Sequence, residues 1–377
     1  MSSAIWITGP PASGKSVLAR AAAAQLSTEG RGVVVLELDE IRKLVTPSPT
    51  YTDTERDVVY RALVYMAMAL TAAGTPVIID ATAHRRAWRD LARRLIPRFA
   101  EVQLVCPLDV CREREARRAA GHAPHGIYDR AGRPGSAVPG VDLPYEPARQ
   151  PELTVDTQRD DRDVAVGRIV ALGRALEEPL ERRAGERPAG WAIWLTGLPG
   201  SGKTTLSRKA AETLAARSTR VHVLGFAEFR RVLLDEGPES EATRDIVHRA
   251  LACTAKLLTD AGMSVIVDAT APRRAWRQLA RELIGRFAEV QLVCPEEICG
   301  ERERAARWHL GAPLSSPPAG GPAPAPDVVL GYESSLRPEL TLHTDTHDLS
   351  ANVEALLRLA QRLQHAADAA PTHSIER

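Results

Sequence analysis

One stretch of the chain occurs twice, almost unchanged. Residues 77–94 read VIIDATAHRRAWRDLARR, and residues 265–282 read VIVDATAPRRAWRQLARE. The two stretches lie 188 positions apart, and the same offset relates Lys15 to Lys203. Solenoid repeats have periods of roughly 20 to 50 residues, so a repeat of this length is a whole domain. The 377-residue chain therefore contains two copies of one domain, each long enough to bury its own core.

Within each copy, short apolar runs alternate with longer stretches of helical periodicity. The runs are continuously apolar, which is typical of strands buried on both faces of a parallel sheet. Residues 87–96 form one expected helix, with Trp88, Leu95 and Phe99 on its apolar stripe. Strands alternating with helices predict two tandem three-layer α/β/α domains with parallel central sheets. The expected strands are 4–8, 33–38, 76–80, 102–106 and 152–156 in copy one, and 192–196, 221–226, 264–268, 290–294 and 339–343 in copy two.

The sequence between the copies indicates the domain boundaries. A helical pattern closes copy one, and the segment after it is charged and contains Pro and Gly, as linkers do. Residues 311–327 of copy two are low in complexity and have no close counterpart in copy one. The predicted organisation is a first domain at 1–175, a linker at 176–190, a second domain at 191–366 and a tail at 367–377.

The first predicted strand of each copy runs into a glycine-rich loop. Copy one has GPPASGKS at 9–16 and copy two has GLPGSGKT at 197–204, and both match G-x-x-x-x-G-K-[ST]. In such a loop the backbone N–H groups hold phosphate, the lysine neutralises the β- and γ-phosphates, and the last hydroxyl binds Mg²⁺. The loops predict ATP and Mg²⁺ as cofactors and a nucleotide-kinase-like P-loop NTPase fold. The expected ATP-binding residues are Gly9, Pro10, Pro11, Ala12, Ser13, Gly14, Lys15 and Ser16 in copy one, and Gly197, Leu198, Pro199, Gly200, Ser201, Gly202, Lys203, Thr204 and Thr205 in copy two; Ser16 and Thr204 are the expected Mg²⁺ ligands.

Two acidic residues at the end of the second predicted strand of copy one, Glu37 and Asp39, are replaced in copy two. Asp39 is expected at the C-terminal edge of that strand, where a carboxylate can hold Mg²⁺ or take a proton from an attacking hydroxyl. Glu37 lies two residues earlier on the same side, and Arg42 can bind an anionic substrate. Solvated charges of a surface loop are the alternative interpretation. Copy two has Gly225 and Ala227 in place of the two acids.

An aspartate closes the third predicted strand of each copy. Asp80 and Asp268 can each act as a Walker B acid that binds Mg²⁺ directly or through water. Each can equally cap the helix that follows, and the sequence leaves both interpretations open. The candidate catalytic residues are Lys15, Asp39 and Asp80.

Arginines concentrate on the helix predicted after the fourth strand of copy one. Arg112, Arg114, Arg117 and Arg118 lead toward the segment expected to close over ATP. Arginine at such a place can stabilise charge on the transferring phosphoryl group. For at least two of the four, the expected role is a solvated, salt-bridged helix face.

The bulk composition excludes several classes of partner. The formal net charge is +1, which gives no overall attraction to nucleic acid or to a membrane. No apolar stretch is long enough to span a membrane, and the N-terminus lacks the pattern of a secretory signal. Five cysteines do not indicate a disulfide framework, and Cys106 and Cys294 are expected to be buried, reduced thiols. We expect a cytoplasmic protein with a small-molecule substrate.

Further segments of copy one resemble the adenylylsulfate kinases. Residues 98–115 resemble the fourth strand and following helix of that family, 125–131 (HGIYDRA) its lid element, and 139–157 (PGVDLPYEPARQPELTVDT) its substrate loop and last strand. The resemblance covers 4–158 and, more weakly, 192–346. It implies a kinase that uses MgATP to phosphorylate the 3′-hydroxyl of adenylylsulfate, giving 3′-phosphoadenylylsulfate in sulfate assimilation.

The resemblance also implies roles for single residues. DEIR at 39–42 corresponds to the family's Asp-Asn-Val-Arg, which gives Asp39 the acid role, including that of a Mg²⁺ ligand, and Arg42 a substrate-binding role. The further substrate ligands implied in this way are Arg56 and Arg86, and Tyr128 belongs to the implied lid element. Asp142 in the substrate-loop segment is another candidate substrate ligand, and Arg112 and Arg117 of the arginine-rich helix are the other candidate lid residues.

The chain departs from the family pattern at several positions. Val59 stands where the family has an Asn that contacts substrate, and Val138 stands where it has a Phe that stacks on adenine. AHRR at 83–86 replaces Ser-Pro-Tyr-Arg. Copy two departs further, since it lacks both acids and only GYES at 331–334 resembles the substrate loop.

Three functions stay open from the sequence. The first is an adenylylsulfate kinase that works through copy one. The second is a phosphotransferase of the same fold that acts on another small-molecule hydroxyl or on a nucleic-acid end, and the third is a nucleotide-binding regulatory protein. Copy two is interpreted as a nucleotide-binding partner with weak or no transfer activity. A homodimer and a pairing of the two copies within one chain both stay open.

Overall fold

The chain divides into two compact units, Met1–Glu186 and Arg187–Arg377, which are described here one at a time. Arg118, His125, most of the predicted linker, the segment 311–327 and the tail 367–377 lie outside the described residues. The computed structural model describes residues 2–30, 32–117, 126–133, 136–177, 189–235, 240–309 and 331–365.

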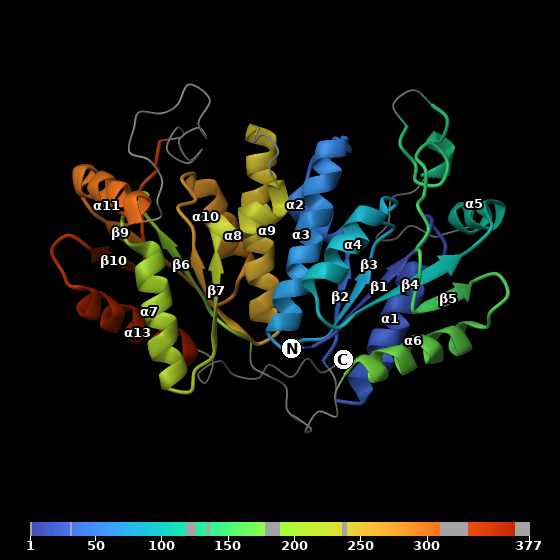
Figure 1. Ribbon diagram of the computed structural model, residues 1–377, viewed down its shortest axis with the longest axis horizontal. Helices are drawn as coiled ribbons and strands as arrows, with labels where there is room; N and C mark the ends of the chain where they lie inside the picture. The colour runs from blue at the N-terminus through green and yellow to red at the C-terminus, as the bar shows by residue number, and fades with distance from the viewer. Residues whose placement is uncertain are drawn as a thin grey trace, which may run out of the picture. The chain divides into compact units, whose positions relative to one another are not determined.

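The first unit is built on a five-stranded sheet in the order β2-β3-β1-β4-β5, with all neighbouring strands parallel (Figure 1). The strand that leads into the phosphate loop, β1, is central, because Ala4 pairs with Val77 of β3 on one side and with Phe99 of β4 on the other. In a parallel sheet the loops that follow the strands emerge at one edge, and ligands bind there. The strands are β1 (Ala4–Thr8), β2 (Val34–Glu37), β3 (Val77–Asp80), β4 (Phe99–Val105) and β5 (Leu153–Asp156).

Helices cover both faces of this sheet (Figure 1). Two of them, α1 and α6, pack over an aliphatic cluster that includes Ile5 and Ile7 of the central strand. Because side chains alternate along a strand, Trp6 points to the opposite face, where α3 and α4 lie. The helices are α1 (Lys15–Thr28), α2 (Leu38–Val45), α3 (Asp53–Ala72), α4 (Arg86–Leu95), α5 (Leu108–Ala116), the 3₁₀ turn η1 (Tyr128–Arg130) and α6 (Arg162–Leu176).

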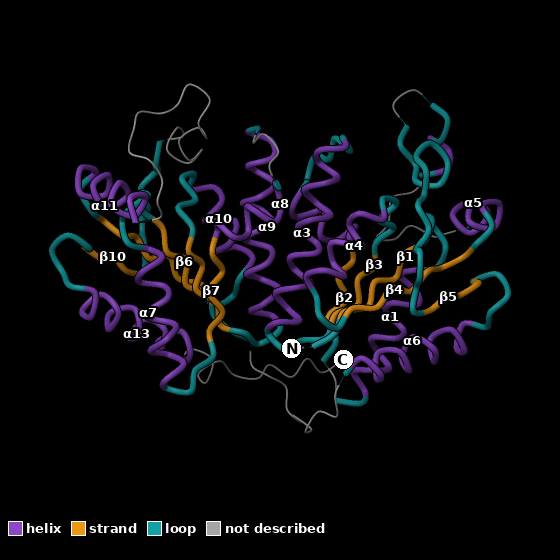
Figure 2. Tube along the Cα trace, in the orientation of Figure 1, coloured by secondary structure: helices purple, strands orange, loops and turns teal. Residues whose placement is uncertain are grey.

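The second unit repeats this plan. Its sheet has the order β10-β9-β6-β8-β7, which is the order of the first sheet read from the other edge (Figure 2). The prediction of two P-loop-type α/β domains with parallel sheets is therefore confirmed. The elements are β6 (Ala192–Thr196), α7 (Lys203–Ala216), β7 (Val221–Gly225), α8 (Phe226–Leu234), α9 (Glu241–Asp260), β8 (Ser264–Asp268), α10 (Arg274–Leu283), β9 (Phe287–Val293), α11 (Glu296–His309), β10 (Leu340–His343) and α13 (Leu349–His365).

Two local expectations were wrong. The strand expected at 33–38 ends at Glu37, and helix α2 begins at Leu38, so Asp39 lies in the first turn of a helix instead of at a strand end. A carboxylate in the first turn suits the positive end of the helix dipole. The helical stripe expected to include Phe99 stops earlier, because α4 ends at Leu95; the residue before Pro97 is extended and Phe99 begins β4.

The state of the cysteines and the character of the helices bear on two expectations drawn from composition. All five cysteines are buried free thiols, as predicted for Cys106 and Cys294. In the described part of the chain, no helix combines the length and the apolar character that crossing a bilayer requires.

A histidine in the core of the second unit replaces a tyrosine of the first. Tyr60 of α3 stacks on Trp88 with ring centroids 4.0 Å apart, and His248 of α9 stacks on Trp276 in the same way at 3.8 Å. The Nδ1 atom of His248 lies 3.0 Å from the carbonyl oxygen of Arg244, while Nε2 is buried without a hydrogen-bond partner among the described residues. Burial lowers the pKa of His248 to about 4, so the folded second unit holds this ring neutral.

We predict that His248 makes the second unit sensitive to acid. The pKa of His248 is lower in the folded than in the unfolded chain. The contribution of the neutral ring to the free energy of unfolding is therefore fully present above about pH 6.5 and is lost as the pH falls toward 4. The loss is on the order of 3 kcal/mol over that window. His248→Phe keeps the stacked ring but cannot take a proton. Denaturant unfolding measures the free energy of unfolding of both proteins at pH 7 and at pH 5. The difference between variant and wild type should be about 2 kcal/mol more in favour of the variant at pH 5 than at pH 7.

The control is His343→Gln, which removes an exposed histidine of the same unit. It should leave the pH dependence of unfolding as it is in wild type. If His248→Phe and wild type lose stability equally between pH 7 and pH 5, the buried histidine is not the source of the acid sensitivity.

Candidate functional site

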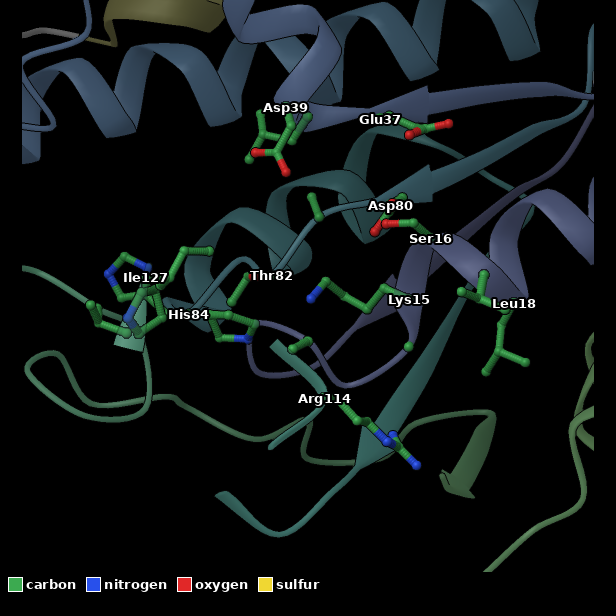
Figure 3. A pocket seen from close by; sticks show the side chains of 18 of the residues that line it. Lys15, Ser16, Leu18, Glu37, Asp39, Asp80, Thr82, His84, Arg114 and Ile127 are labelled. Carbon is green, nitrogen blue, oxygen red and sulfur yellow. The ribbon is translucent and has the colours of Figure 1, made fainter. Parts of the chain in front are cut away.

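A cavity of about 790 Å³ lies at the C-terminal edge of the first sheet. Its wall takes residues from the phosphate loop, from the ends of β2 and β3, from α3 and from the segment 136–139. Figure 3 shows Lys15 and Asp80 in this cavity, with Glu37 at the end of β2 and Asp39 in the first turn of α2 nearby. The fold thus brings together three predicted catalytic residues that are far apart in the sequence.

The phosphate loop of the first unit has the geometry that its sequence predicts. Gly14, with φ +98°, caps α1, and Lys15 is the first residue of that helix. The Lys15 ammonium is almost fully buried and donates to the carbonyl oxygens of Gly9 (3.1 Å) and Pro10 (2.9 Å). These bonds hold the cation across the loop, where it can face the β- and γ-phosphates of a nucleotide.

The phosphate loop of the second unit holds its lysine in the same way. Lys203 donates to the carbonyl oxygens of Gly197 (2.9 Å) and Leu198 (2.8 Å). Gly200 has φ +77°, and a Cβ atom there would lie 2.2 Å from the carbonyl oxygen of Cys299, so only glycine fits. Both units therefore present a cationic, N–H-lined cradle at a helix N-terminus.

The aspartate at the end of the third strand faces the phosphate-loop hydroxyl in both units. In the second unit Thr204 donates to the Asp268 carboxylate over 2.6 Å. In the first unit burial raises the pKa of Asp80, and Lys15 together with a hydrogen bond from Ser16 opposes that shift (Figure 3). Carboxylate and hydroxyl oxygens are the ligands that Mg²⁺ prefers, and it takes its other ligands from phosphate and water. The donor set therefore fits Mg²⁺ and favours the metal-binding interpretation of the strand-end aspartates over the helix cap.

The two acids at the end of β2 have different surroundings. Glu37 accepts a hydrogen bond of 2.7 Å from Nε of Arg20, so its charge is compensated by α1. Asp39 also lines the cavity, one residue into α2. The second unit has Gly225 at the end of β7 and Ala227 in the first turn of α8. The second unit thus lacks these two carboxylates at the matched positions, although Glu228 lies in the same first turn of α8.

Two arginines form a cationic wall of the cavity. Arg42 pairs with the buried Glu55 over 3.1 Å, and Arg56 donates to the carbonyl oxygen of Ala137 over 3.0 Å. Both guanidinium groups lie over the ring of Tyr51, at 5.2 and 5.9 Å from its centroid. Burial lowers the pKa of Arg56, which shows a desolvated cation that an anionic ligand would stabilise.

Five of the predicted substrate and lid residues do not line the cavity: Tyr128, and the four residues Arg86, Arg112, Arg117 and Asp142. Arg86 donates to the carbonyl oxygen of Pro147 (3.2 Å), and Arg117 pairs with Glu113. Asp142 accepts hydrogen bonds from the backbone of Gly132 and Val138, and Arg112 lies over the ring of Tyr128 at 6.0 Å. In this structure these side chains organise loops and a helix surface, and their contact with substrate stays a prediction.

The predicted lid residue Tyr128 connects the lid segment to the phosphate loop. Its hydroxyl donates to the carbonyl oxygen of Pro11 over 2.8 Å. The backbone N–H groups of Ile127 and Tyr128 donate in turn to Glu115 of α5. The lid segment is therefore held to the phosphate loop by the hydroxyl of Tyr128 and to α5 by its backbone N–H groups.

Sequence reasoning missed several residues of the cavity wall. Tyr51 has φ +55°, a conformation that costs an aromatic residue energy and is common at functional sites. Arg130 and His84 also line the cavity. Arg114, one of the four arginines expected near ATP, lines it as well and donates to the hydroxyl and carbonyl oxygens of Thr157. Only the difference between His84 and Pro272, its counterpart in copy two, gave a signal in the sequence.

Comparison with known proteins places the chain among characterised relatives. The sequence profile of the adenylylsulphate kinase family matches residues 1–156 and 189–309. The probable adenylyl-sulfate kinase of Archaeoglobus fulgidus is 37% identical over 163 residues, which are 43% of this chain and 100% of that protein. The adenylyl-sulfate kinase of Bacillus velezensis is 35% identical over 174 residues, which are 45% of this chain and 83% of that protein. The structure of the Mycobacterium tuberculosis APS kinase CysC in complex with AMPPNP and APS is 27% identical, with a TM-score of 0.37 over 46% of this chain and 99% of that one.

The fold and the site together define a phosphate-loop kinase, in which a nucleotide cradle, a strand-end acid and a cationic wall share one cavity. The chain belongs to the adenylylsulphate kinase family, whose profile matches both copies. It is accordingly an ATP-dependent phosphotransferase of the adenylylsulfate kinase type.

We predict that Lys15→Ala abolishes phosphoryl transfer. The variant removes the cation that balances the γ-phosphate, and loss of one such contact lowers the rate on the order of 10²–10³-fold. ADP release by the full chain measures the effect. Lys203→Ala removes the same contact from the second unit and is the matched control. Near-normal turnover in Lys15→Ala, with loss in Lys203→Ala, would assign the reaction to the second unit.

Proposed function

We propose that the first unit transfers the γ-phosphate of ATP to the 3′-hydroxyl of adenylylsulfate, and that the second unit binds nucleotide with little transfer. The observation that carries the proposal is the cavity of the first unit, where Asp39 lies with Lys15 and the two arginines Arg42 and Arg56. Relatives that align with less than half of the chain are named adenylyl-sulfate kinases, which supports the choice of acceptor.

Each group of the cavity has a part in the proposed reaction. Lys15 neutralises the migrating phosphoryl group, and Arg42 and Arg56 bind the anionic part of the acceptor. The acceptor hydroxyl oxygen bonds to the γ-phosphorus, the bond from that phosphorus to the β–γ bridging oxygen breaks, and the hydroxyl proton passes to Asp39. Mg²⁺, when bound, neutralises charge on the phosphates; Ser16 and Asp39 would hold it, with Asp80 beside Ser16.

The second unit retains the nucleotide cradle but not the groups that act on the acceptor. Lys203 and Thr204 keep the positions of Lys15 and Ser16, and Thr204 would be the Mg²⁺ ligand. Gly225 and Ala227 offer no carboxylate to the acceptor hydroxyl. The second unit can therefore hold ATP, but it has little with which to activate a hydroxyl.

One observation favours a second candidate function, the phosphorylation of a different hydroxyl. The cavity wall contains Val138 where the family has an adenine-stacking Phe, and His84 where it has a proline. Both changes fall at the place where an acceptor would bind. ADP release measured with adenylylsulfate and with a panel of other hydroxyl compounds distinguishes the two candidates.

We predict that Asp39→Asn lowers kcat far more than it weakens ATP binding. The amide keeps the size of the side chain, but it cannot take the hydroxyl proton and it has no negative charge with which to bind Mg²⁺. Steady-state kinetics and ATP titration of the same preparation measure the two quantities. A collapse of ATP binding with an unchanged kcat would transfer the acid role to Asp80.

We predict that the two units divide the work. Residues 1–175 expressed alone should phosphorylate the acceptor, whereas residues 190–377 should bind ATP and transfer little, because only the first has Glu37 and Asp39 after its second strand. Calorimetric ATP titration and the ADP-release assay on each half measure both properties. Robust transfer by the second half alone would overturn the proposed division.

A further inference from the structure

His84 is a buried polar residue in the wall of the cavity (Figure 3). The side chain is 4% exposed, and its ring lies edge-on to Trp88 with centroids 5.1 Å apart. Its Nδ1 atom is buried and has no hydrogen-bond partner in the part of the chain that the structure describes. Buried polar groups are nearly always paired, so an unpaired one in a binding cavity indicates a partner supplied by a ligand.

The backbone at this position does not require a histidine. The carbonyl oxygen of His84 accepts a hydrogen bond from the N–H of Glu146 (2.8 Å). In the second unit the carbonyl oxygen of Pro272 accepts a hydrogen bond from the N–H of Glu333 (2.9 Å). The preceding residue is an alanine with positive φ in both units, +43° and +41°. Because proline fits the same frame, the imidazole of His84 is an addition to the cavity and not a requirement of the fold.

The electrostatic surroundings keep this imidazole neutral. Burial lowers the pKa of His84 to about 4, and the cations Arg56 and Arg85 add to the shift, while Asp53 and Glu146 oppose it. At neutral pH the ring therefore has one N–H donor and one lone-pair acceptor. Rotation of the ring by 180° about χ2 places the nitrogens where the carbons were. A nitrogen can therefore face a ligand from either edge of the ring.

We propose that His84 is a specificity-determining residue of the acceptor site, where its imidazole forms a hydrogen bond with a polar atom of the acceptor nucleotide bound beside Arg56. The inference rests on the proposed function, since it concerns the acceptor of that reaction. Arg56 and the carbonyl of Ala137, which accepts from it, belong to the same cavity wall. A proline at this place offers only apolar surface, so the histidine selects for an acceptor with a hydrogen-bonding atom there.

The first test uses the full chain with the variant His84→Pro, which copies the residue of the second unit. The KM for adenylylsulfate should rise about tenfold through loss of one hydrogen bond, while the KM for ATP should stay within twofold. His84→Asn keeps a hydrogen-bonding group and should recover part of the loss. Pro272→His makes the reverse change in the second unit and should leave both constants as in wild type.

A direct readout is the imidazole signal itself. In the full chain labelled at histidine with ¹³C and ¹⁵N, the signal missing from His84→Asn identifies His84. Titration with adenylylsulfate in the presence of ADP, and separately with adenosine 5′-monophosphate, should shift this signal. Inorganic sulfate alone is the control for an effect of charge.

The outcomes separate this inference from the proposed function. Turnover of adenylylsulfate by wild type, with unchanged constants in His84→Pro and an unchanged His84 signal, would overturn the role of His84 and leave the proposed function standing. Absence of turnover with a His84 signal that responds to the nucleotides would overturn the proposed acceptor and support the contact. A signal that responds to none of the nucleotides overturns the contact whether or not turnover occurs.

Discussion

A buried arginine connects the elements that build the site. Arg89 of α4 pairs with Glu101 of β4 over 2.7 Å, and both side chains are almost fully buried. The guanidinium also donates to the hydroxyl of Thr8, the last residue of β1, and to the carbonyl oxygens of Ala83 and Glu146. One side chain thus ties the strand before the phosphate loop to the segment that carries His84. A buried pair of this kind costs about 3–5 kcal/mol when one partner is removed, because the other charge is left uncompensated.

The second unit keeps the buried pair and its bonds to loop carbonyls, and it has lost other features. Arg277 pairs with Glu289 over 2.7 Å and donates to the carbonyl oxygens of Ala271 and Glu333. The arginine-centred contacts beside the nucleotide cradle are therefore similar in both units, although Glu37, Asp39 and His84 have no counterpart in the second. Since binding of phosphate needs little more than the loop backbone and its lysine, a domain can lose acceptor chemistry and still hold a nucleotide. This difference in requirements is the physical basis for the proposed division between the units.

Much of the candidate site could be predicted because its parts are local in sequence. The positive φ of Gly14 and the position of Lys15 follow from the loop itself, and the run of apolar residues before Asp80 identifies a strand end. The start of α2 at Leu38 was missed, because an apolar run followed by acids suits a strand end and a helix start equally. The contacts of Arg86 and Asp142 with loop backbone could not be foreseen, since they depend on how distant segments fold back over the sheet.

The sequence by itself determined the duplication, the order of strands and helices, the two phosphate loops and the loss of acids in the second copy. These features depend on periodicity, on glycine and on residue identity at matched positions, all of which are visible without coordinates. Only the tertiary structure decided which side chains share the cavity. The burial of His84, the pairing of Arg42 with Glu55 and the placement of Arg56 beside Ala137 arise from contacts between segments remote in the chain. Such contacts are fixed by packing, and packing leaves no periodic trace in the order of the residues.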